Sequence, residues 1–179
     1  RSALQWLALN AGAALAYWLA ARLGAALSVG NPSASVLWPP NGLALALLMA
    51  WGWRVLPGLL AGSLVPVLLT AIEQQLGLLQ GFLVPTLVRL GSAAQWLLAC
   101  HLLGDWRAAL GRPGSRVALR FVLTALGCCL IAPSAGLTTL LGVGRVTAQE
   151  LPAAWLVWWV GDAAGMLVVA PLLLTALHP

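Results

Sequence analysis

The sequence predicts an all-α integral membrane protein, a bundle of about six transmembrane helices. Three observations lead to this fold class. Of the 179 residues, 61% are hydrophobic and only 7% are charged, whereas a soluble domain usually carries about a quarter charged residues. The mean hydropathy is +0.95. The apolar residues also gather into repeated stretches of the length, about 20 residues, that crosses a hydrocarbon core about 30 Å thick.

The predicted spans follow one another along the chain with short polar links. At about 1.5 Å of rise per residue, each is long enough to cross the bilayer. The second and third are joined by the very tight link Trp51–Arg54, and Pro39-Pro40 lies near the start of the second. Two full spans are expected here, with a broken or re-entrant second helix near Pro39-Pro40 as the alternative. The six stretches are Leu4–Ala21, Val36–Trp53, Val55–Ile72, Phe82–Leu103, Val117–Leu141 and Ala153–Leu177.

Arginines at the segment ends predict the orientation. With the N-terminus inside, the cytoplasmic links hold six arginines and the outer loops only Arg22 and Arg145. Positive charge is enriched on the cytoplasmic side of membrane proteins, so both termini are expected in the cytoplasm of a multi-pass inner-membrane protein. The six inner arginines are Arg1, Arg54, Arg107, Arg112, Arg116 and Arg120.

The same distribution argues against several classes of protein. The net charge of +5 comes from arginines without any lysine, and no basic face for nucleic acid is present. The cysteines Cys100, Cys128 and Cys129 lie in apolar segments without ligand spacing, so neither a metal site nor a cofactor is expected. Cys100 and His101 lie near the inner face, away from the other polar groups, so no catalytic residues are predicted.

Two charged residues lie inside the predicted spans, where an ionisable side chain is costly and suggests a functional site. Arg89 falls seven residues into the fourth stretch and Asp162 nine residues into the sixth. Both stretches enter from outside, which gives similar depths of roughly 10 Å and roughly 13 Å. A partnership is therefore geometrically open, either as part of a binding site or as an ion pair that fixes helix register.

Two tryptophan-rich motifs lie at comparable depth. Trp38, Pro39, Pro40 and Asn41 begin the second stretch, where prolines are best tolerated and where a polar side chain can face a cavity. Trp158 and Trp159 lie one turn before Asp162 and can form either an interfacial belt or an aromatic wall beside the charge. Together with Arg89 and Asp162 these residues form the predicted ligand-binding or signalling site.

These motifs resemble one known family. Trp38-Pro39-Pro40-Asn41-Gly42, the run RVLPGLLAGS from Arg54 to Ser63, and Trp158-Trp159-Val160-Gly161-Asp162 followed by Gly165 and Pro171 occur in the order typical of the first-described class of bacterial membrane-associated sensor domains, MASE. The resemblance extends from about Trp38 to Pro171.

The resemblance implies a single sensory domain, residues 1–179, that forms part of a longer chain with a C-terminal cytoplasmic output. That output would be a histidine kinase or a cyclic-di-GMP enzyme, acting as a homodimer. The signal would be a small molecule, a lipid or a partner membrane protein. A small transporter, or a substrate-binding subunit of one, is the alternative, because it shares an outward cavity with intramembrane charges.

Overall fold

The computed structural model describes residues 3–28, 35–104 and 114–177, and within these residues it contains helices and no strand. Two of the helical segments, η2 and η3, are π-helical turns and η1 is a 3₁₀ turn. The elements are α1 (Ala3–Ala26), α2 (Pro39–Trp51), η1 (Gly52–Val55), α3 (Leu56–Glu73), η2 (Leu79–Leu83), α4 (Val84–Leu103), α6 (Ser115–Cys128), α7 (Ile131–Gly142), α8 (Leu151–Ala164), η3 (Gly165–Val169) and α9 (Ala170–Leu177).

Four helical stretches of the described chain are long and apolar enough to cross a membrane. The prediction of an all-α membrane protein is thus confirmed in its class, whereas the number of six transmembrane helices is not. Helix α1 is not among these stretches, and α2, η1 and α3 together make up the first of them. The four stretches are Pro39–Glu73, Leu79–Leu103, Ser115–Gly142 and Leu151–Leu177.

The Pro39–Glu73 run folds back on itself at Gly52. The dihedral angles of this glycine, φ 70° and ψ −160°, are not helical, and only glycine adopts such a conformation readily. The start of α2 packs on Gly24, near the end of α1, whereas Gly58 and Gly62 of α3 pack on Asn10 and Ala14 in the same order along the chain. Helix α1 therefore runs parallel to α3 and antiparallel to α2, which makes α2 and α3 a hairpin.

Helix α2 is shorter than the predicted second segment. It begins at Pro39 and continues unbroken to Trp51, so Pro39 and Pro40 occupy its first turn instead of interrupting it. Its 13 residues rise only about 20 Å, less than a hydrocarbon core. Ser35 to Trp38 precede it as non-helical chain packed against α8.

The predicted Val117–Leu141 helix is also divided, between α6 and α7 at Cys129-Leu130. Pro133 explains the break, because proline has no N–H and its ring cannot lie against the carbonyl four residues earlier, that of Cys129. The amide of Ala132, in the first turn of α7, bonds to a side chain of α4.

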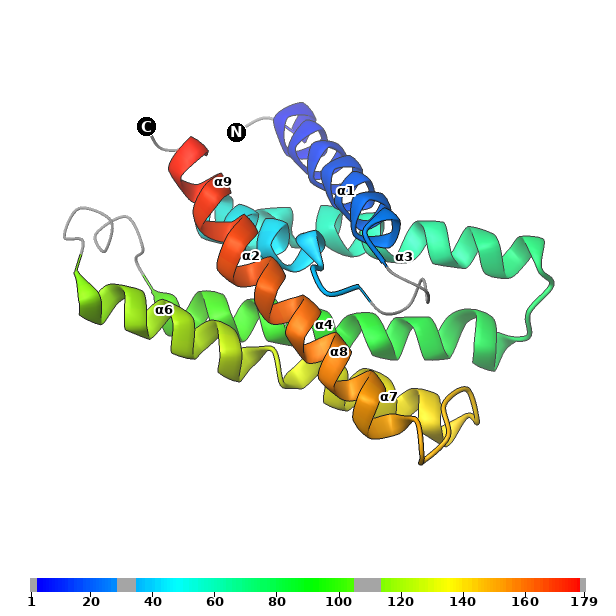
Figure 1. Ribbon diagram of the computed structural model, residues 1–179. Helices are drawn as coiled ribbons and strands as arrows, with labels where there is room; N and C mark the ends of the chain where they lie inside the picture. Colours follow the sequence, from blue (N-terminus) through cyan, green and yellow to red (C-terminus); the bar gives the residue numbers. More distant parts are fainter. Residues whose placement is uncertain (1–2, 29–34, 105–113, 178–179) are drawn as a thin grey trace.

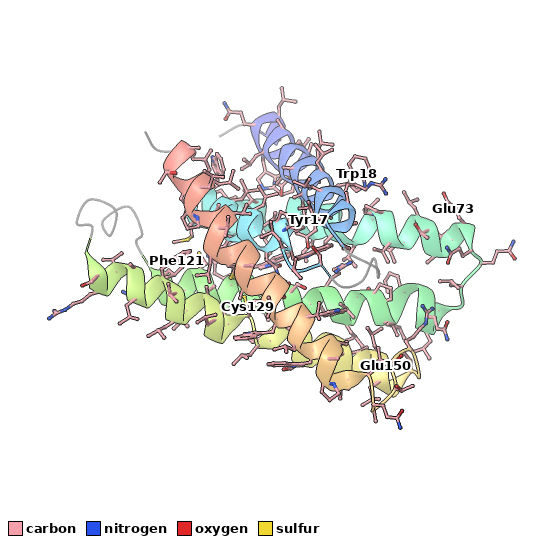
Figure 2. All side chains as sticks on the ribbon, viewed as in Figure 1. Tyr17, Trp18, Glu73, Phe121, Cys129 and Glu150 are labelled. Atoms are coloured by element: carbon pink, nitrogen blue, oxygen red, sulfur yellow. The ribbon has the colours of Figure 1, made fainter. Side chains whose placement is uncertain are left out.

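The last helical stretch, α8, η3 and α9, runs obliquely across α4, α6 and α2 (Figure 1). Buried side chains such as Leu45, Trp96 and Met166 fill the interior between these helices. The outer surface is apolar: Leu4, Ile72 and Leu172 are 75%, 73% and 66% exposed. Such a surface suits contact with lipid rather than water. Glu73 and Glu150 both lie toward one end of the bundle and Phe121 toward the other (Figure 2).

Candidate functional site

The two tryptophan motifs meet in the centre of the molecule, where the start of α2 crosses the junction of α8 and η3. The amide of Trp38 donates to the carbonyl of Gly161 at 2.9 Å. A Cβ on Gly165 would lie 2.0 Å from the carbonyl oxygen of Trp38, and one on Gly42 would lie 2.1 Å from the carbonyl oxygen of Gly165. The backbones approach so closely that only glycine fits, which gives the spacing of both motifs a physical reason.

This crossing brings Asp162 into a network of amide side chains. Gln95 of α4 accepts a hydrogen bond from the free amide of Ala132 at 3.2 Å, and this fixes its Oε1. Its Nε2 then donates to Asp162 Oδ2 at 3.3 Å. The break between α6 and α7 thus orients Gln95, and Gln95 in turn positions the carboxylate.

Asn41 completes the network from the side of α2. Trp96 Nε1 donates to Asn41 Oδ1 at 2.7 Å, so the Asn41 amide nitrogen remains for Asp162, which lies within hydrogen-bonding reach. Trp96 and Gln95 are fully buried, and Asn41 and Asp162 are 2% and 8% exposed. Tyr17 of α1 packs on Trp96, with ring centroids 5.5 Å apart. One buried network therefore joins four of the principal helices, α1, α2, α4 and α8.

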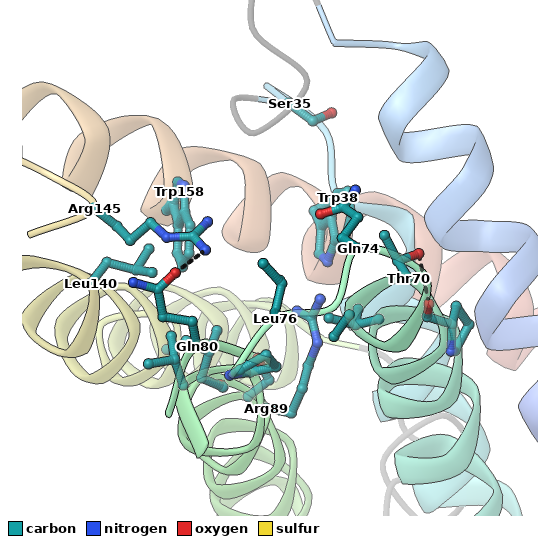
Figure 3. Close-up of a pocket in the computed structure, with 18 of the residues that line it drawn as sticks. Ser35, Trp38, Thr70, Gln74, Leu76, Gln80, Arg89, Leu140, Arg145 and Trp158 are labelled. Carbon is teal, nitrogen blue, oxygen red and sulfur yellow. Dashed lines mark hydrogen bonds between the residues drawn. The ribbon is translucent and has the colours of Figure 1, made fainter. Parts of the chain in front are cut away.

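A cavity of about 570 Å³ opens beside this network. Its walls come from α3, the α3–α4 turn, α4, α7 and α8, and Trp38, Arg89, Trp158 and Asp162 are among the residues that line it. Such a volume is typical of a small-molecule site. At its polar end, Arg145 donates to Gln80 Oε1 at 3.0 Å (Figure 3).

Arg89 extends from α4 toward Trp38 in this cavity (Figure 3). Its Nε is buried and has no hydrogen-bond partner among the described residues. Arg89 and Asp162 line the same cavity but form no direct salt bridge. A buried guanidinium nitrogen without an acceptor is unfavourable, and it leaves hydrogen-bonding capacity for a ligand.

The structure brings some of the predicted site residues to the cavity and places the others outside it. Trp38, Arg89, Trp158 and Asp162 line the cavity, and Asn41 lies behind Asp162. Trp159 lies elsewhere: its Nε1 donates to the carbonyl of Leu126 in α6 at 3.0 Å, and its ring stacks on Trp155. The buried residues Pro39 and Pro40 belong to the packed start of α2.

Sequence reasoning missed Gln95, Trp96 and Tyr17. Each lies in an apolar helix, carries no formal charge and belongs to none of the motifs. A signal existed for Gln95, since a glutamine in the middle of a span needs hydrogen-bond partners as a charge does. Within the described residues, no group of three His, Cys, Asp or Glu side chains could hold a metal ion. The arrangement is suited to binding.

Comparison with known proteins gives one match. The MASE1 family model matches residues 9–179, essentially the whole chain. No curated protein and no solved structure matches the chain.

Proposed function

Because the chain belongs to the MASE1 family, the membrane-associated sensor domains 1, we propose that it is the input domain of a bacterial signalling protein, with the cavity as its signal-binding site. A MASE1 domain is a membrane-embedded sensor rather than a catalytic domain. A small molecule, a lipid or a partner membrane protein enters the cavity, and the resulting change passes to a cytoplasmic histidine kinase or cyclic-di-GMP enzyme in the same chain.

The observation that carries this proposal is the position of Asp162. The residue lines the cavity and also lies in α8, the helix that continues through η3 into α9. Helix α9 in turn packs along α2, which Asn41 connects to the same carboxylate. A ligand that binds two arrangements of this crossing with different affinities would shift α9, since a ligand changes an equilibrium only by its differential affinity.

The π-helical turn η3 is a suitable place for such a shift. It begins at Gly165, less than one turn after Asp162, and lies at the contact with Trp38 and Gly42. A π-helical turn holds an extra residue within an α-helix, and such turns are frequent at functional sites. Moving the extra residue along the helix would rotate α9 relative to α8.

The proposed topology has six passes in the bacterial inner membrane. The opposite directions of α2 and α3 support two passes for the Pro39–Glu73 run, although α2 itself is short. Helix α1, parallel to α3 and packed on it, adds another. The start of α1 and the end of α9 then lie on one side, which the arginine bias assigns to the cytoplasm. The output domains act as a homodimer.

The test is the output activity of the intact signalling protein in membranes, with Asp162→Asn and Arg89→Gln introduced singly and together. Each change is expected to alter basal or signal-dependent output about fivefold or more. This factor corresponds to the lower end of the coupling free energies usually found between two sites. Arg116→Gln, at the exposed start of α6, is the matched control and should leave output unchanged. Folded variants that all signal like the parent would overturn the proposal.

A further inference from the structure

The cavity carries an excess of positive charge. Among its lining residues, Arg89 and Arg145 are cationic and Asp162 alone is acidic. The acceptor of Arg145 is the neutral amide oxygen of Gln80, which does not offset its charge. Within the part of the chain that the structure describes, Arg89 Nε has no hydrogen-bond partner and neither guanidinium forms a salt bridge. In surroundings of low dielectric such charges attract an anion strongly.

Asp162 is poorly placed to bind a cation. The residue is 8% exposed, and its carboxylate already faces the amide nitrogens of Gln95 and Asn41. A cationic ligand would have to displace these donors and approach two arginines of like charge. The aromatic walls could hold a cation or an uncharged ring equally well, so the two arginines determine the sign of the ligand's charge.

The remaining walls are apolar. Trp38 and Trp158 lie on the side of α2 and α8, and Pro66, Val67 and Val88 come from α3 and α4. A volume of about 570 Å³ exceeds what a small inorganic anion fills and leaves room for an apolar or aromatic body.

From this geometry we infer that the cavity binds an amphipathic oxyanion: a carboxylate or phosphate group pairs with Arg89 and Arg145, and its apolar body lies between Trp38, Trp158 and α3. The planar guanidinium of arginine matches both kinds of oxyanion with paired hydrogen bonds. This inference rests on the proposed function, since it names the ligand class of the same cavity. The oxyanion belongs either to a membrane lipid or to a water-soluble molecule.

The experiment uses four probes with the same body and different head groups: 4-phenylbutyrate, 4-phenylbutyl phosphate, 4-phenylbutanol and 4-phenylbutylammonium. Equilibrium binding is measured on the intact signalling protein in nanodiscs of phosphatidylcholine, for the parent and for Arg89→Gln, Arg89→Lys, Arg145→Gln and the control Arg116→Gln. Thermal unfolding of each variant establishes that it is folded.

The two anionic probes are expected to bind the parent at least about tenfold more tightly than the alcohol and the ammonium probe. One charge-assisted hydrogen bond is sufficient for a difference in affinity of this size. Arg89→Gln should remove that preference, Arg89→Lys should keep part of it because the charge remains without the fork, and Arg145→Gln should reduce it several-fold. Arg116→Gln should bind like the parent. Equal or tighter binding of the ammonium probe, or an anion preference that survives Arg89→Gln, overturns the inference.

Replacing phosphatidylcholine with phosphatidylglycerol identifies the source of the anion. Displacement of the anionic probe that depends on Arg89 assigns the site to a lipid head group, and undiminished probe binding assigns it to a soluble molecule. Comparison with output separates the two proposals. If Arg89→Gln changes output while no anionic probe binds, the sensor function stands and the ligand class is wrong. If anionic probes bind as expected while no cavity variant changes output, the site exists but does not signal.

Discussion

Two helix contacts in this protein are both built from glycines and amide side chains, but they differ in function. Where α1 meets α3, glycines admit the neighbouring backbone and one amide side chain, that of Asn10, joins the helices: its Nδ2 donates to the carbonyls of Trp6 and Arg54, and its Oδ1 accepts from the amide of Gly58 at 2.7 Å. Both N–H groups and the oxygen of that amide therefore have partners within this contact.

The crossing of α2 with α8 and η3 also relies on glycines and amides, but its network ends on a charged group. Gln95 and Asn41 both face Asp162, and Asp162 faces the cavity that holds the unpartnered Nε of Arg89. The difference is instructive: a closed polar contact fixes two helices, whereas an open one leaves charge and volume for a ligand. The first should matter for stability alone and the second for output as well.

The largest expected effect comes from adding a side chain at Gly165, where η3 packs against the backbone of Trp38. A Cβ at Gly165 would lie 2.0 Å from the carbonyl oxygen of Trp38 and cannot be accommodated without separating α2 from η3. Gly165→Ala is therefore expected to destabilise the fold by about 3 kcal/mol or more. Gly127→Ala is the control, because a Cβ added there would meet no described atom of a neighbouring element within 4 Å. Thermal unfolding in detergent measures both, and similar melting temperatures would contradict the close approach.

The second prediction separates the two amides. Asn10→Leu leaves the carbonyl of Arg54 and the amide of Gly58 without partners and should cost about 2 kcal/mol of stability without changing the specific output of the folded protein. Gln95→Leu should change stability and output together, because it releases Asp162 as well as the amide of Ala132. The comparison fails if Asn10→Leu alters output per folded molecule as much as Gln95→Leu does.

The third prediction uses neighbouring tryptophans. Trp158 lines the cavity, whereas Trp159 bonds to α6 outside it. Trp158→Phe should shift signal-dependent output a few-fold by enlarging the cavity, and Trp159→Phe should lower stability by about 1 kcal/mol through the lost hydrogen bond to Leu126. Dose–response curves in membranes, together with melting temperatures, distinguish the two. A larger change in output for Trp159→Phe than for Trp158→Phe would show that the site lies on the other face of α8.

The smallest expected effect lies in the loop before α8. Thr147 donates to Glu150 Oε2 through its hydroxyl at 2.7 Å and through its backbone amide at 3.0 Å, and these bonds hold the pKa of Glu150 below its ordinary value of 4.5. The carboxylate therefore supports the loop fully above that pH, and its support is lost as the pH falls through the lowered pKa. An NMR titration of the Glu150 carboxyl should give a higher pKa in Thr147→Val. An unchanged pKa would show that the hydroxyl bond is absent.

The sequence was sufficient for the class of protein and for the motifs, because both are local. Composition identified the membrane protein, and the segments Phe82–Leu103 and Ala153–Leu177 lie within two or three residues of the observed stretches. The fold-back at Gly52 could be anticipated as a tight link, but not the shortness of α2, which depends on the chain before Pro39 packing against α8.

The site was predicted only in part, for a physical reason. Charge and tryptophan content marked Trp38, Arg89, Trp158 and Asp162, but depth alone could not tell an ion pair from two charges that share a cavity. The role of Gln95 depends on the amide of Ala132, in the first turn of another helix, a relation visible only after the helices have packed. Trp158 and Trp159 are adjacent in sequence and differ only in direction, which helix periodicity leaves undetermined until the partners are known.

The most direct test of the central claim, that the Asp162 network positions α9, is a distance measurement between spin labels at Leu4 and Leu172. Both positions are strongly exposed, and the three native cysteines would be replaced by alanine. In the intact protein in nanodiscs, Asp162→Asn should shift the distance distribution between α1 and α9, whereas Asn10→Leu should leave its centre in place. A distribution that Asp162→Asn leaves unchanged, in a variant whose output has changed, would show that the signal reaches the cytoplasm by another route.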